Sequence, residues 1–383
     1  MNPATVDDVI VIGAGIIGAA CAWRLAERGL SVRWLERETA AATGSTARSA
    51  AGVRVQFSDI TNIALSAASI AEYATMPAAA YDRLGYLFLV PPDAWPAHRD
   101  GARLQQGLGH DVRILTPEAS QAIVRSRIDD LAGATFCPTD GVVDPHGITM
   151  TYAQRAREAG AVLHLDRRVD AITRLDDGGR ERWRVRAGGH EHVGRWLVNA
   201  CGAWSGETGR MAGLAVPVRP ARRMVFCSGP LATPHRYPLT VDVASGAWFR
   251  SERQRLLFGR SDPAEFGFSE GIDWSWLDAT IEPLLDRFPW FDSIGLDRKA
   301  CWWGYYEVTP DHQPLVGPTA RAPGWLDACG FSGHGVQQAA AIGRIIAQLA
   351  CGEAPFIEVS SLSPDRFDAD GDGRDRERER LIV

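Results

Sequence analysis

Residues 8–36, DVIVIGAGIIGAACAWRLAERGLSVRWLE, decide the fold of this chain. The apolar run at 8–12 predicts a buried strand, and a GAGIIG turn follows it directly. Residues 19–28 then predict a helix, and residues 31–36 predict a second strand that ends in an acid, Glu36. Strand, glycine turn, helix, strand and acid form a complete βαβ unit. In this context the GxGxxG match is a specific signal for a dinucleotide site.

Each glycine of this turn suits a bound pyrophosphate in a different way. Gly13 permits the tight turn, Gly15 lets the backbone approach the phosphates, and Gly18 lets the helix pack closely on the strand. The helix N-terminus offers N–H groups and a partial positive charge, and Glu36 can accept hydrogen bonds from ribose hydroxyls. A glycine turn that binds nothing is the alternative, and the complete βαβ context argues against it.

The composition is that of a globular protein. The 383 residues are 45% hydrophobic and 23% charged, and at about 150 residues per domain they predict about two to three domains. A net charge of −6 argues against a nucleic-acid partner. The seven cysteines are scattered without a CxxC pair, so we expect a reduced, cytoplasmic protein with no disulfide framework and no metal site. We find neither a signal peptide nor an apolar run of the roughly 18 residues that span a membrane.

The fold class expected is α/β (α+β overall), with two kinds of segment. Asp177-Gly178 predicts a hairpin, residues 195–200 a buried strand, and residues 336–349 a helix that follows a glycine turn. Residues 216–310 lack a βαβ pattern and read as antiparallel strands with clustered tryptophans. We therefore expect a discontinuous Rossmann-like nucleotide-binding domain and a second domain that is mostly an antiparallel β-sheet.

Several motifs resemble one known family. The chain is similar to the FAD-dependent amine oxidoreductases of the D-amino-acid oxidase, glycine oxidase and sarcosine oxidase superfamily. The resemblance is carried by GAGIIG with Glu36, GSTARSAAGVRVQF (44–57), PTDGVVDPHGITMTYAQRAREAGA (138–161), LVNACGAWS (197–205), TPDHQPLVGP (309–318) and GFSGHGVQQAAAIGR (330–344). The last two are most similar to the sarcosine oxidase and dimethylglycine dehydrogenase branch, while STARSAA and ALSAAS resemble bacterial D-amino-acid dehydrogenases.

The resemblance implies a division of the chain. The FAD-binding domain is expected at 1–80, 145–215 and 325–367, the substrate domain at 81–144 and 216–324, and a charged tail at 368–383. The tail matches the calcium-loop pattern from Asp368 to Glu379, but no amphipathic helix precedes it, so we expect a charged tail without metal.

FAD is the cofactor that the resemblance implies, bound without a covalent link. Gly304 stands where monomeric sarcosine oxidase attaches FAD to a cysteine, and Cys301 is three residues away. The expected FAD-binding residues are Gly13, Gly15, Ile16, Ile17, Gly18, Glu36, Arg37, Ser45, Thr46, Arg48, Ala51, Gly52, Val53, Val169, Cys201, Gly202, Trp204, Gly304, Gly333, His334, Gly335, Val336 and Gln337. Among these, Gly333–Gln337 would place a helix N-terminus against the pyrimidine end of the flavin, where negative charge develops.

Arg54 is the first candidate for a substrate residue, because it stands where sarcosine oxidases grip the substrate carboxylate and its fork suits that group. A surface arginine paired with Asp59 is the alternative. Arg222 or Arg223 is a second candidate, with a strand-edge arginine as the alternative.

Aromatic and polar candidates complete the expected substrate site. Trp248, with Phe249 beside it, and Tyr306, with Tyr305 beside it, are expected at the substrate, although buried aromatic residues are more often core. His334 and Gln337 complete the catalytic candidates.

The sequence therefore predicts an enzyme that oxidises the C–N bond of a small amino acid, with a secondary or N-methylated amino acid favoured over a D-amino acid. A hydride passes to flavin N5, and the imine is hydrolysed. A 2-hydroxy-acid dehydrogenase and a flavoprotein subunit of a hetero-oligomeric complex are the alternatives. The electron acceptor could be O2, a quinone or a partner flavoprotein, and the chain could form homo- or hetero-oligomers. Leu257 stands where monomeric sarcosine oxidase has its oxygen-activating lysine, which weakens the case for an oxidase.

Overall fold

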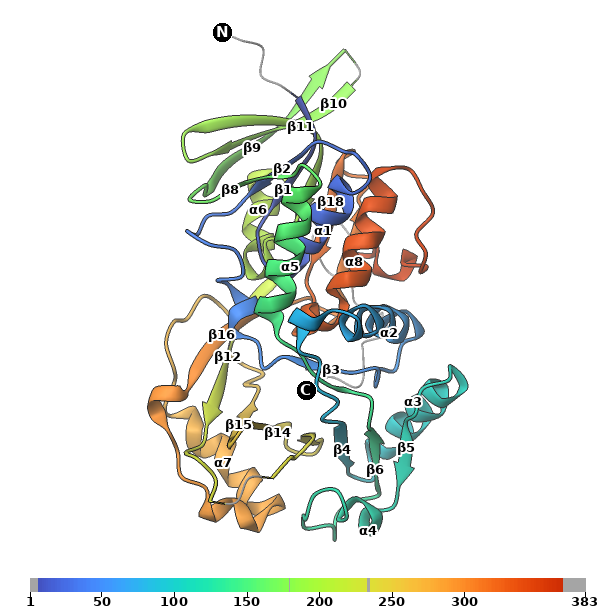
Figure 1. Cartoon of the computed structure of the whole chain (residues 1–383), viewed down its shortest axis with the longest axis vertical. Coiled ribbons are helices and arrows are strands. Elements are labelled where there is room, and N and C mark those ends of the chain that lie inside the picture. Colours follow the sequence, from blue (N-terminus) through green and yellow to red (C-terminus); the bar gives the residue numbers. More distant parts are fainter. Residues whose placement is uncertain (1–5, 179, 233–234, 368–383) are drawn as a thin grey trace.

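Two large sheets lie at opposite ends of the molecule. The structure, a computed structural model, describes residues 6–178, 180–232 and 235–367 (Figure 1). The upper half of the view contains the first sheet with α1, α5 and α8, and the lower half contains the second sheet with α3, α4 and α7. This mixed α/β architecture, with one mainly parallel and one mainly antiparallel sheet, confirms the expected fold class.

The first sheet has the strand order β17-β18-β11-β1-β2-β8. Its neighbours are parallel except β17, which runs antiparallel to β18. β9 and β10 extend antiparallel from β11. The bounds are β1 Val6–Ile12, β2 Val32–Leu35, β8 Val162–His164, β9 Val169–Asp177, β10 Arg180–Ala187, β11 His190–Asn199, β17 Leu315–Pro318 and β18 Trp325–Cys329.

Side-chain alternation along β1 gives the first sheet two covered faces. Val9 and Val11 pack in the core formed with the helices, whereas Ile10 and Ile12 pack with β9 and β10 on the other face. A run of apolar residues without polar alternation is therefore what a central strand buried on both faces requires. The helices of this half are α1 Ile16–Ala26, α2 Ile60–Ala74, α5 Pro145–Glu158, α6 Ser205–Met211 and α8 Gly335–Ala350.

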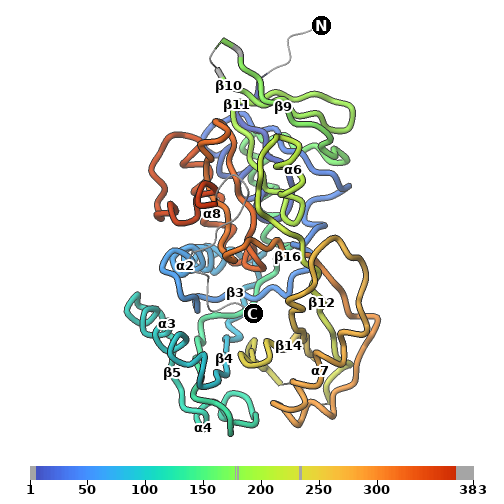
Figure 2. Tube along the Cα trace, turned by 180° about the vertical axis from the view of Figure 1, so that it is seen from behind, coloured from blue at the N-terminus to red at the C-terminus, as the bar shows by residue number. Residues whose placement is uncertain are grey.

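Small residues let α1 and α8 approach each other closely. A Cβ at Gly343 of α8 would lie 2.6 Å from the backbone carbon of Ala20 in α1. From behind, α8 lies beside α2 (Figure 2), and the Ala341 N–H donates to Ser69 Oγ at 3.1 Å. The N-terminus of α8 is therefore held in place by two helices at once.

The second sheet is almost wholly antiparallel, in the order β16-β12-β15-β14-β13-β4-β6-β5. Only β13 and β4 pair in parallel. Its strands are β4 Tyr86–Val90, β5 Arg113–Leu115, β6 Gly133–Cys137, β12 Arg219–Cys227, β13 Leu239–Asp242, β14 Ala247–Glu252, β15 Arg255–Arg260 and β16 Trp302–Val308. Its helices are α3 Trp95–Gly107, α4 Pro117–Ser120 and α7 Trp276–Arg287.

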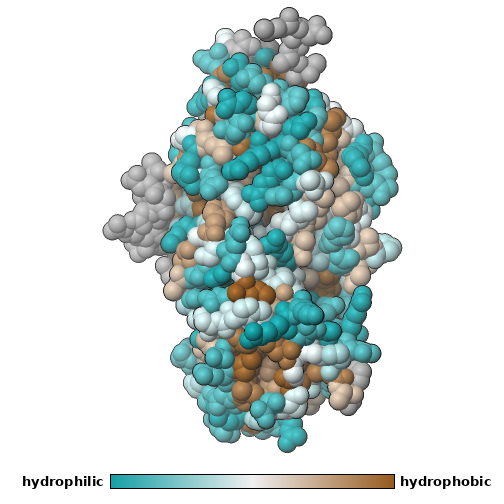
Figure 3. Space-filling model, turned by 90° about the vertical axis from the view of Figure 1, so that its left-hand side faces the viewer, coloured by the Kyte–Doolittle hydropathy of each residue, from teal (hydrophilic) through white to brown (hydrophobic). Residues whose placement is uncertain are grey.

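Aromatic side chains fill the core of this second half. Phe249 contacts Phe288, Trp290 and Phe291 edge-on, with ring centroids between 4.9 and 5.7 Å apart. On the face in Figure 3, hydrophobic residues gather in the lower half, while the upper half is mostly hydrophilic. On this face the lower half of the molecule thus exposes more apolar surface than the upper half.

Short elements connect the two halves. β3 Gly52–Val53 pairs with β7 Gly141–Val142, and the 3-10 helices are η1 Ser45–Arg48, η2 Pro77–Ala79, η3 Gly202–Trp204, η4 Pro289–Ser293, η5 Arg298–Ala300, η6 Ser360–Leu362 and η7 Pro364–Arg366. β17 lies in the first sheet, whereas the expected division placed 315–318 in the substrate domain. β17 belongs there because it pairs with β18 from Leu315 to Pro318. The remaining domain boundaries stay predictions.

Candidate functional site

One elongated cavity runs from the glycine turn of the first sheet to β12, β14 and β16 of the second, and we call it the central cavity. It is lined by segments around residues 12–17, 35–38, 44–54, 167–169, 200–211, 223–225, 304–307 and 332–337, with Tyr86, Leu239, Trp248 and Arg260 among the others. The segments that carry the family resemblance therefore meet around a single space.

The glycine turn is closed by contacts that exclude a side chain. Gly13 has φ +102°, and a Cβ there would lie 2.3 Å from the Ala200 carbonyl oxygen. A Cβ at Gly18 would lie 1.9 Å from the Gly13 oxygen. Gly18 does not line the central cavity, so its part in the site is the close approach of α1 to the turn. At Gly15 a Cβ would lie 3.2 Å from Thr46 Oγ1, at the cavity wall.

Glu36 holds the end of β2 against this turn. Its Oε2 accepts a hydrogen bond from the Ala14 N–H at 2.6 Å, and its Oε1 accepts one from the Glu38 N–H at 3.0 Å. An ionised carboxylate can accept about four hydrogen bonds, so it can still bind a hydroxyl. Arg37 lies next to it, with its guanidinium 3.7 Å from the Trp204 ring centroid. This end of the cavity, with Val169, is suited to an adenosine group.

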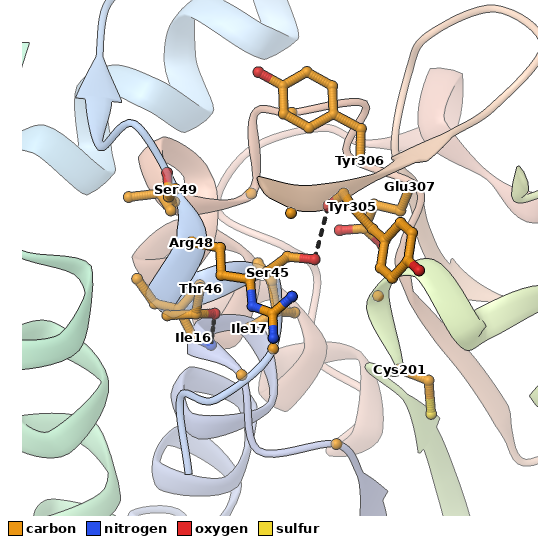
Figure 4. Close-up of a pocket in the computed structure, with 18 of the residues that line it drawn as sticks. Ile16, Ile17, Ser45, Thr46, Arg48, Ser49, Cys201, Tyr305, Tyr306 and Glu307 are labelled. Atoms are coloured by element: carbon orange, nitrogen blue, oxygen red, sulfur yellow. Dashed lines mark hydrogen bonds between the residues drawn. The ribbon is translucent and has the colours of Figure 1, made fainter. Parts of the chain in front are cut away.

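The segment 44–52 crosses the cavity in front of α1. The Ile16 N–H donates to Thr46 Oγ1 at 3.0 Å, and Ser45 Oγ donates to the Tyr305 carbonyl oxygen at 2.7 Å (Figure 4). The Arg48 guanidinium lies 4.5 Å from the Trp303 ring centroid. The segment is thus tied both to the first helix and to β16 of the second sheet.

The N-terminus of α8 forms the opposite wall. Gly333 has φ +95°, and a Cβ there would lie 2.4 Å from the Tyr306 ring. Gln337 Oε1 accepts the Arg54 N–H at 2.8 Å. Ala51, Gly52, Gly335 and Val336 also line this region. Only glycine at 333 allows this turn to lie against the Tyr306 ring.

Arg54 is buried, with only 2% of its surface exposed. Its Nη1 donates to the Gln56 carbonyl oxygen, its Nη2 lies 3.4 Å from His334 Nε2, and the guanidinium sits 4.1 Å from the Phe57 ring centroid. Burial, and next the Arg54 charge, lower the pKa of His334 well below its ordinary value. At neutral pH His334 is therefore an uncharged imidazole beside a fixed cation.

Strand alternation selects which side chains of β12 and β16 enter the cavity. Arg223 pairs with Gly304, and Ala221 pairs with Tyr306, so Arg223 and Tyr306 share a face. The Arg223 guanidinium lies 5.4 Å from the Tyr306 ring centroid.

Tyr86 also lines the cavity. Burial raises the pKa of Tyr86 to about 12, although the positive charge of Arg54 lowers it. Tyr86 is therefore a neutral hydroxyl at neutral pH.

Four expected residues do not line the central cavity. Arg222 points to the other face of β12, where Nε lies 3.2 Å from Glu265 Oε1 and Nη1 donates to the Glu270 carbonyl oxygen at 3.1 Å. Val53 is fully buried in the helix-side core, and Gly18 packs against the turn. Phe249 also points into the core, while Trp248 lines the cavity. The other expected site residues line the cavity, and their roles stay predictions.

Sequence reasoning missed Glu307 and Tyr86, which both line the cavity. Glu307 Oε2 accepts the Gly330 N–H at 2.8 Å, and burial raises its pKa to about 7. Glu307 stands two residues before the first residue of the TPDHQPLVGP motif, and this was the signal available in the sequence. Tyr86 begins a fully apolar strand and has no signal that separates it from core residues.

Behind Arg54 lies Asp140, which sequence reasoning also missed. It is fully buried, and it accepts the Val55 N–H at 2.9 Å and Gln56 Nε2 at 3.1 Å. Burial raises its pKa to about 7 despite these hydrogen bonds and the Arg54 charge, which lower it. It therefore supports the loop that carries Arg54.

Metal binding and membrane insertion are two further properties on which the described residues bear. Within the described ranges, no group of three or more His, Cys, Asp or Glu side chains is arranged to hold a metal ion. No helix in the same part of the chain is long and apolar enough to cross a membrane. The calcium-loop pattern at Asp368–Glu379 lies outside the described residues.

Comparisons with known proteins agree with this site. The sequence model of a family described as FAD dependent oxidoreductase matches residues 8–349. FAD-dependent oxidoreductase domain-containing protein 1 of Bos taurus is 27% identical over 412 residues, covering 94% of this chain and 84% of that protein. Mitochondrial sarcosine dehydrogenase of Mus musculus is 25% identical, covering 94% of this chain but only 41% of that protein. The crystal structure of L-proline dehydrogenase from P. horikoshii has a TM-score of 0.85 at 26% identity, covering 95% of this chain and 98% of that one.

Proposed function

The chain belongs to the FAD dependent oxidoreductase family, and on this premise we propose that it oxidises the C–N bond of a small secondary or N-methylated amino acid. The family is FAD-dependent, and its relatives support an amine oxidoreductase. Sarcosine dehydrogenase and L-proline dehydrogenase, which are similar to this chain, carry names of secondary amino acids. This similarity favours a secondary amine over a primary one.

The central cavity fits an FAD molecule. Glycines at 13, 15, 304 and 333 leave its wall bare where a Cβ would meet backbone, Thr46, Arg48 or Tyr306. The first turn of α1 and Thr46 would hold the pyrophosphate, Glu36 the ribose, and the N-terminus of α8 the flavin. A bound FAD would supply the acceptor for a hydride from the carbon next to the substrate nitrogen, and water would hydrolyse the resulting imine.

Buried Arg54 is the observation that carries the substrate assignment. A guanidinium with 2% exposure, at the far end of a dinucleotide cavity, is a charged fork that cannot lose its proton. Its contacts with Gln56 and His334 fix its direction, and the planar fork of N–H donors matches the two oxygens of a carboxylate. Arg54 would orient an amino acid by its carboxylate.

The neighbouring side chains would keep the amine reactive. His334 is uncharged, and Tyr86 and Tyr306 are neutral hydroxyls at neutral pH, because burial raises the pKa of both tyrosines. The aromatic surfaces of Tyr86, Trp248 and Tyr306 would exclude water from the reacting carbon. A neutral amine, which has the lone pair that oxidation needs, is favoured in such surroundings.

An anaerobic titration tests this function. The purified holoprotein is mixed with sarcosine, dimethylglycine, proline, D-amino acids and 2-hydroxy acids, and the flavin band at about 450 nm is followed. Bleaching by sarcosine or proline supports the proposal, whereas bleaching by 2-hydroxy acids alone overturns it. The rate at which the colour returns in air then separates an oxidase from a dehydrogenase.

Arg54 variants test the carboxylate role. Arg54→Met should raise the substrate dissociation constant by about ten- to hundredfold, the usual effect of losing a hydrogen bond to a charged group. Arg54→Lys keeps the charge but not the fork, so it should weaken binding less. Arg83→Met, an exposed arginine outside the cavity, is the control. Unchanged binding in folded, FAD-loaded Arg54→Met would refute the assignment.

A further inference from the structure

Arg223 also lines the central cavity, and the function proposed above does not use it. It lies on β12, on the face that also presents Tyr306 from β16. Among the described residues its only hydrogen bond runs from Nη1 to the carbonyl oxygen of Arg222, at 2.8 Å. Its Nε is buried and has no hydrogen-bond partner there. The side chain is therefore held in the cavity without an anion.

The acidic side chains near Arg223 contact other groups. Burial lowers the pKa of Arg223, whereas the negative charges of Asp262 and Glu265 raise it. In the described part of the chain, however, neither carboxylate lies within 4 Å of the Arg223 guanidinium as an ion pair. Glu265 instead faces Arg222 at 3.2 Å, and an Asp262 oxygen accepts the Ala264 N–H at 2.9 Å. Burying a guanidinium without a paired anion is costly. A bound anion would remove that cost.

The charges of both Arg54 and Arg223 act on Tyr306. Both Arg223 and Arg54 lower the pKa of Tyr306, although burial raises it more. Arg54 comes from the loop after β3 and contacts Phe57 and His334, whereas Arg223 comes from β12. The guanidinium groups of Arg54 and Arg223 thus reach the cavity from separate elements, and the charge of each acts on the Tyr306 hydroxyl.

We propose that the substrate carries a second carboxylate, which Arg223 binds together with the Tyr306 hydroxyl while Arg54 binds the first. This inference rests on the proposed function and narrows its substrate class to N-substituted or cyclic amino acids with two carboxylates. An amino acid with one carboxylate would bind at Arg54 and leave the Arg223 guanidinium without an anion, and this difference gives the selectivity. Arg223 is a specificity-determining residue of this site.

Binding of carboxylates that cannot be oxidised tests the proposal without turnover. Malonate, succinate, glutarate and adipate, and the monocarboxylates propionate and butyrate, are titrated into the holoprotein while the flavin spectrum is followed. The best dicarboxylate should bind at least about tenfold more tightly than a monocarboxylate of similar length. The optimum in this series then measures the spacing between the two anion sites.

Arg223→Met should abolish this preference and leave monocarboxylate binding within about twofold of wild type, since Arg54 remains. Arg223→Lys should retain part of it. Arg219→Met, an exposed arginine on the same strand outside the cavity, is the control. FAD content and Tm verify folding, and Arg223→Gln replaces the methionine variant if that variant does not fold.

Two results would overturn the inference. One is equal affinity of the wild-type protein for mono- and dicarboxylates. The other is an equal loss of both in Arg223→Met, which would mean that Arg223 and Arg54 grip one carboxylate together. The proposed function fails separately: if no amine bleaches the flavin, the amine chemistry is wrong even where dicarboxylates bind through Arg223. If sarcosine bleaches it and dicarboxylates show no preference, only the second anion site is wrong.

Discussion

At the scale of single residues, Arg222 and Arg223 are adjacent in the chain and have opposite surroundings. β12 directs Arg223 into the central cavity and Arg222 toward Glu265 and Glu270. The sequence could name the pair as candidates, but it could not choose between them, because the choice depends on which face of the strand meets the cavity. The same alternation separates Trp248 in the cavity from Phe249 in the core.

Glu307 gives a prediction at this scale. Burial raises its pKa from the ordinary 4.5 to about 7. Between these two pH values the folded protein keeps a proton that the unfolded chain releases, so this residue lowers stability increasingly as the pH rises across that window. Glu307→Gln removes the effect and keeps an acceptor for the Gly330 N–H. Relative to wild type, the free energy of unfolding of the variant should therefore increase between pH 4.5 and pH 7. Above pH 7 the difference between the two proteins should stay constant.

Thermal unfolding of both proteins at a series of pH values, in the same FAD-saturated buffers, measures this difference. Glu158→Gln, at an exposed position of α5, is the matched control and should follow wild type. A difference between Glu307→Gln and wild type that does not change with pH would contradict the prediction.

At the scale of elements, α1 and α8 illustrate how small residues set a helix pair. Repeated alanines and glycines at the interface are visible in the sequence, but their partners are not. Gly343 meets the backbone of Ala20, which is more than 300 positions away in the chain, and this contact positions the N-terminus of α8 at the cavity. The glycine turn at 13–18 differs, because contacts such as those of Gly18 with Gly13 and of Ala14 with Glu36 lie within the βαβ unit, although Thr46 and Ala200 also contact the turn.

Gly343→Ala and Gly107→Ala form a matched pair with opposite expected signs. Alanine is favoured over glycine in a helix by about 1 kcal/mol. At Gly107, near the end of α3, no atom lies within 4 Å of the new Cβ, so that variant should be neutral or stabilised. At Gly343 the new Cβ would lie 2.6 Å from Ala20, and overpacking should cost about 1–3 kcal/mol.

Urea unfolding of the two variants, with FAD affinity measured in parallel, tests this pair. Gly343→Ala should also bind FAD more weakly, because α8 carries the flavin wall. Equal stability of the two variants would show that α1 and α8 can separate without cost.

At the scale of the whole molecule, the central cavity lies between the two halves of the structure, and both sheets line it (Figure 1). FAD bound there would contact segments from 13 to 337 and would hold both halves together. We expect FAD to be bound without a covalent link. Position 304 is glycine, Cys301 does not line the cavity, and burial raises the pKa of the cavity residue Cys201 to about 12, so its thiol is unreactive.

Acid precipitation should therefore release all flavin into the supernatant. The apoprotein should unfold at a lower temperature than the holoprotein, and added FAD at about 100 times its dissociation constant should restore about 2.7 kcal/mol. Absorbance of the supernatant and Tm against FAD concentration are the measurements. Flavin that stays in the pellet, or a Tm that does not depend on FAD, would contradict this expectation.

The sequence by itself determined the βαβ unit, the glycine turn, the discontinuous fold and the family. These depend on residues close together in the chain, whose spacing is visible directly. Only the tertiary structure decided which side chains form the substrate end of the cavity. Arg54, Tyr86, Arg223, Trp248 and Tyr306 come from separate elements, and their meeting depends on strand register and on the face that each strand turns to the cavity. No local pattern encodes a register between segments that are hundreds of residues apart, because it is set by the packing of the whole chain.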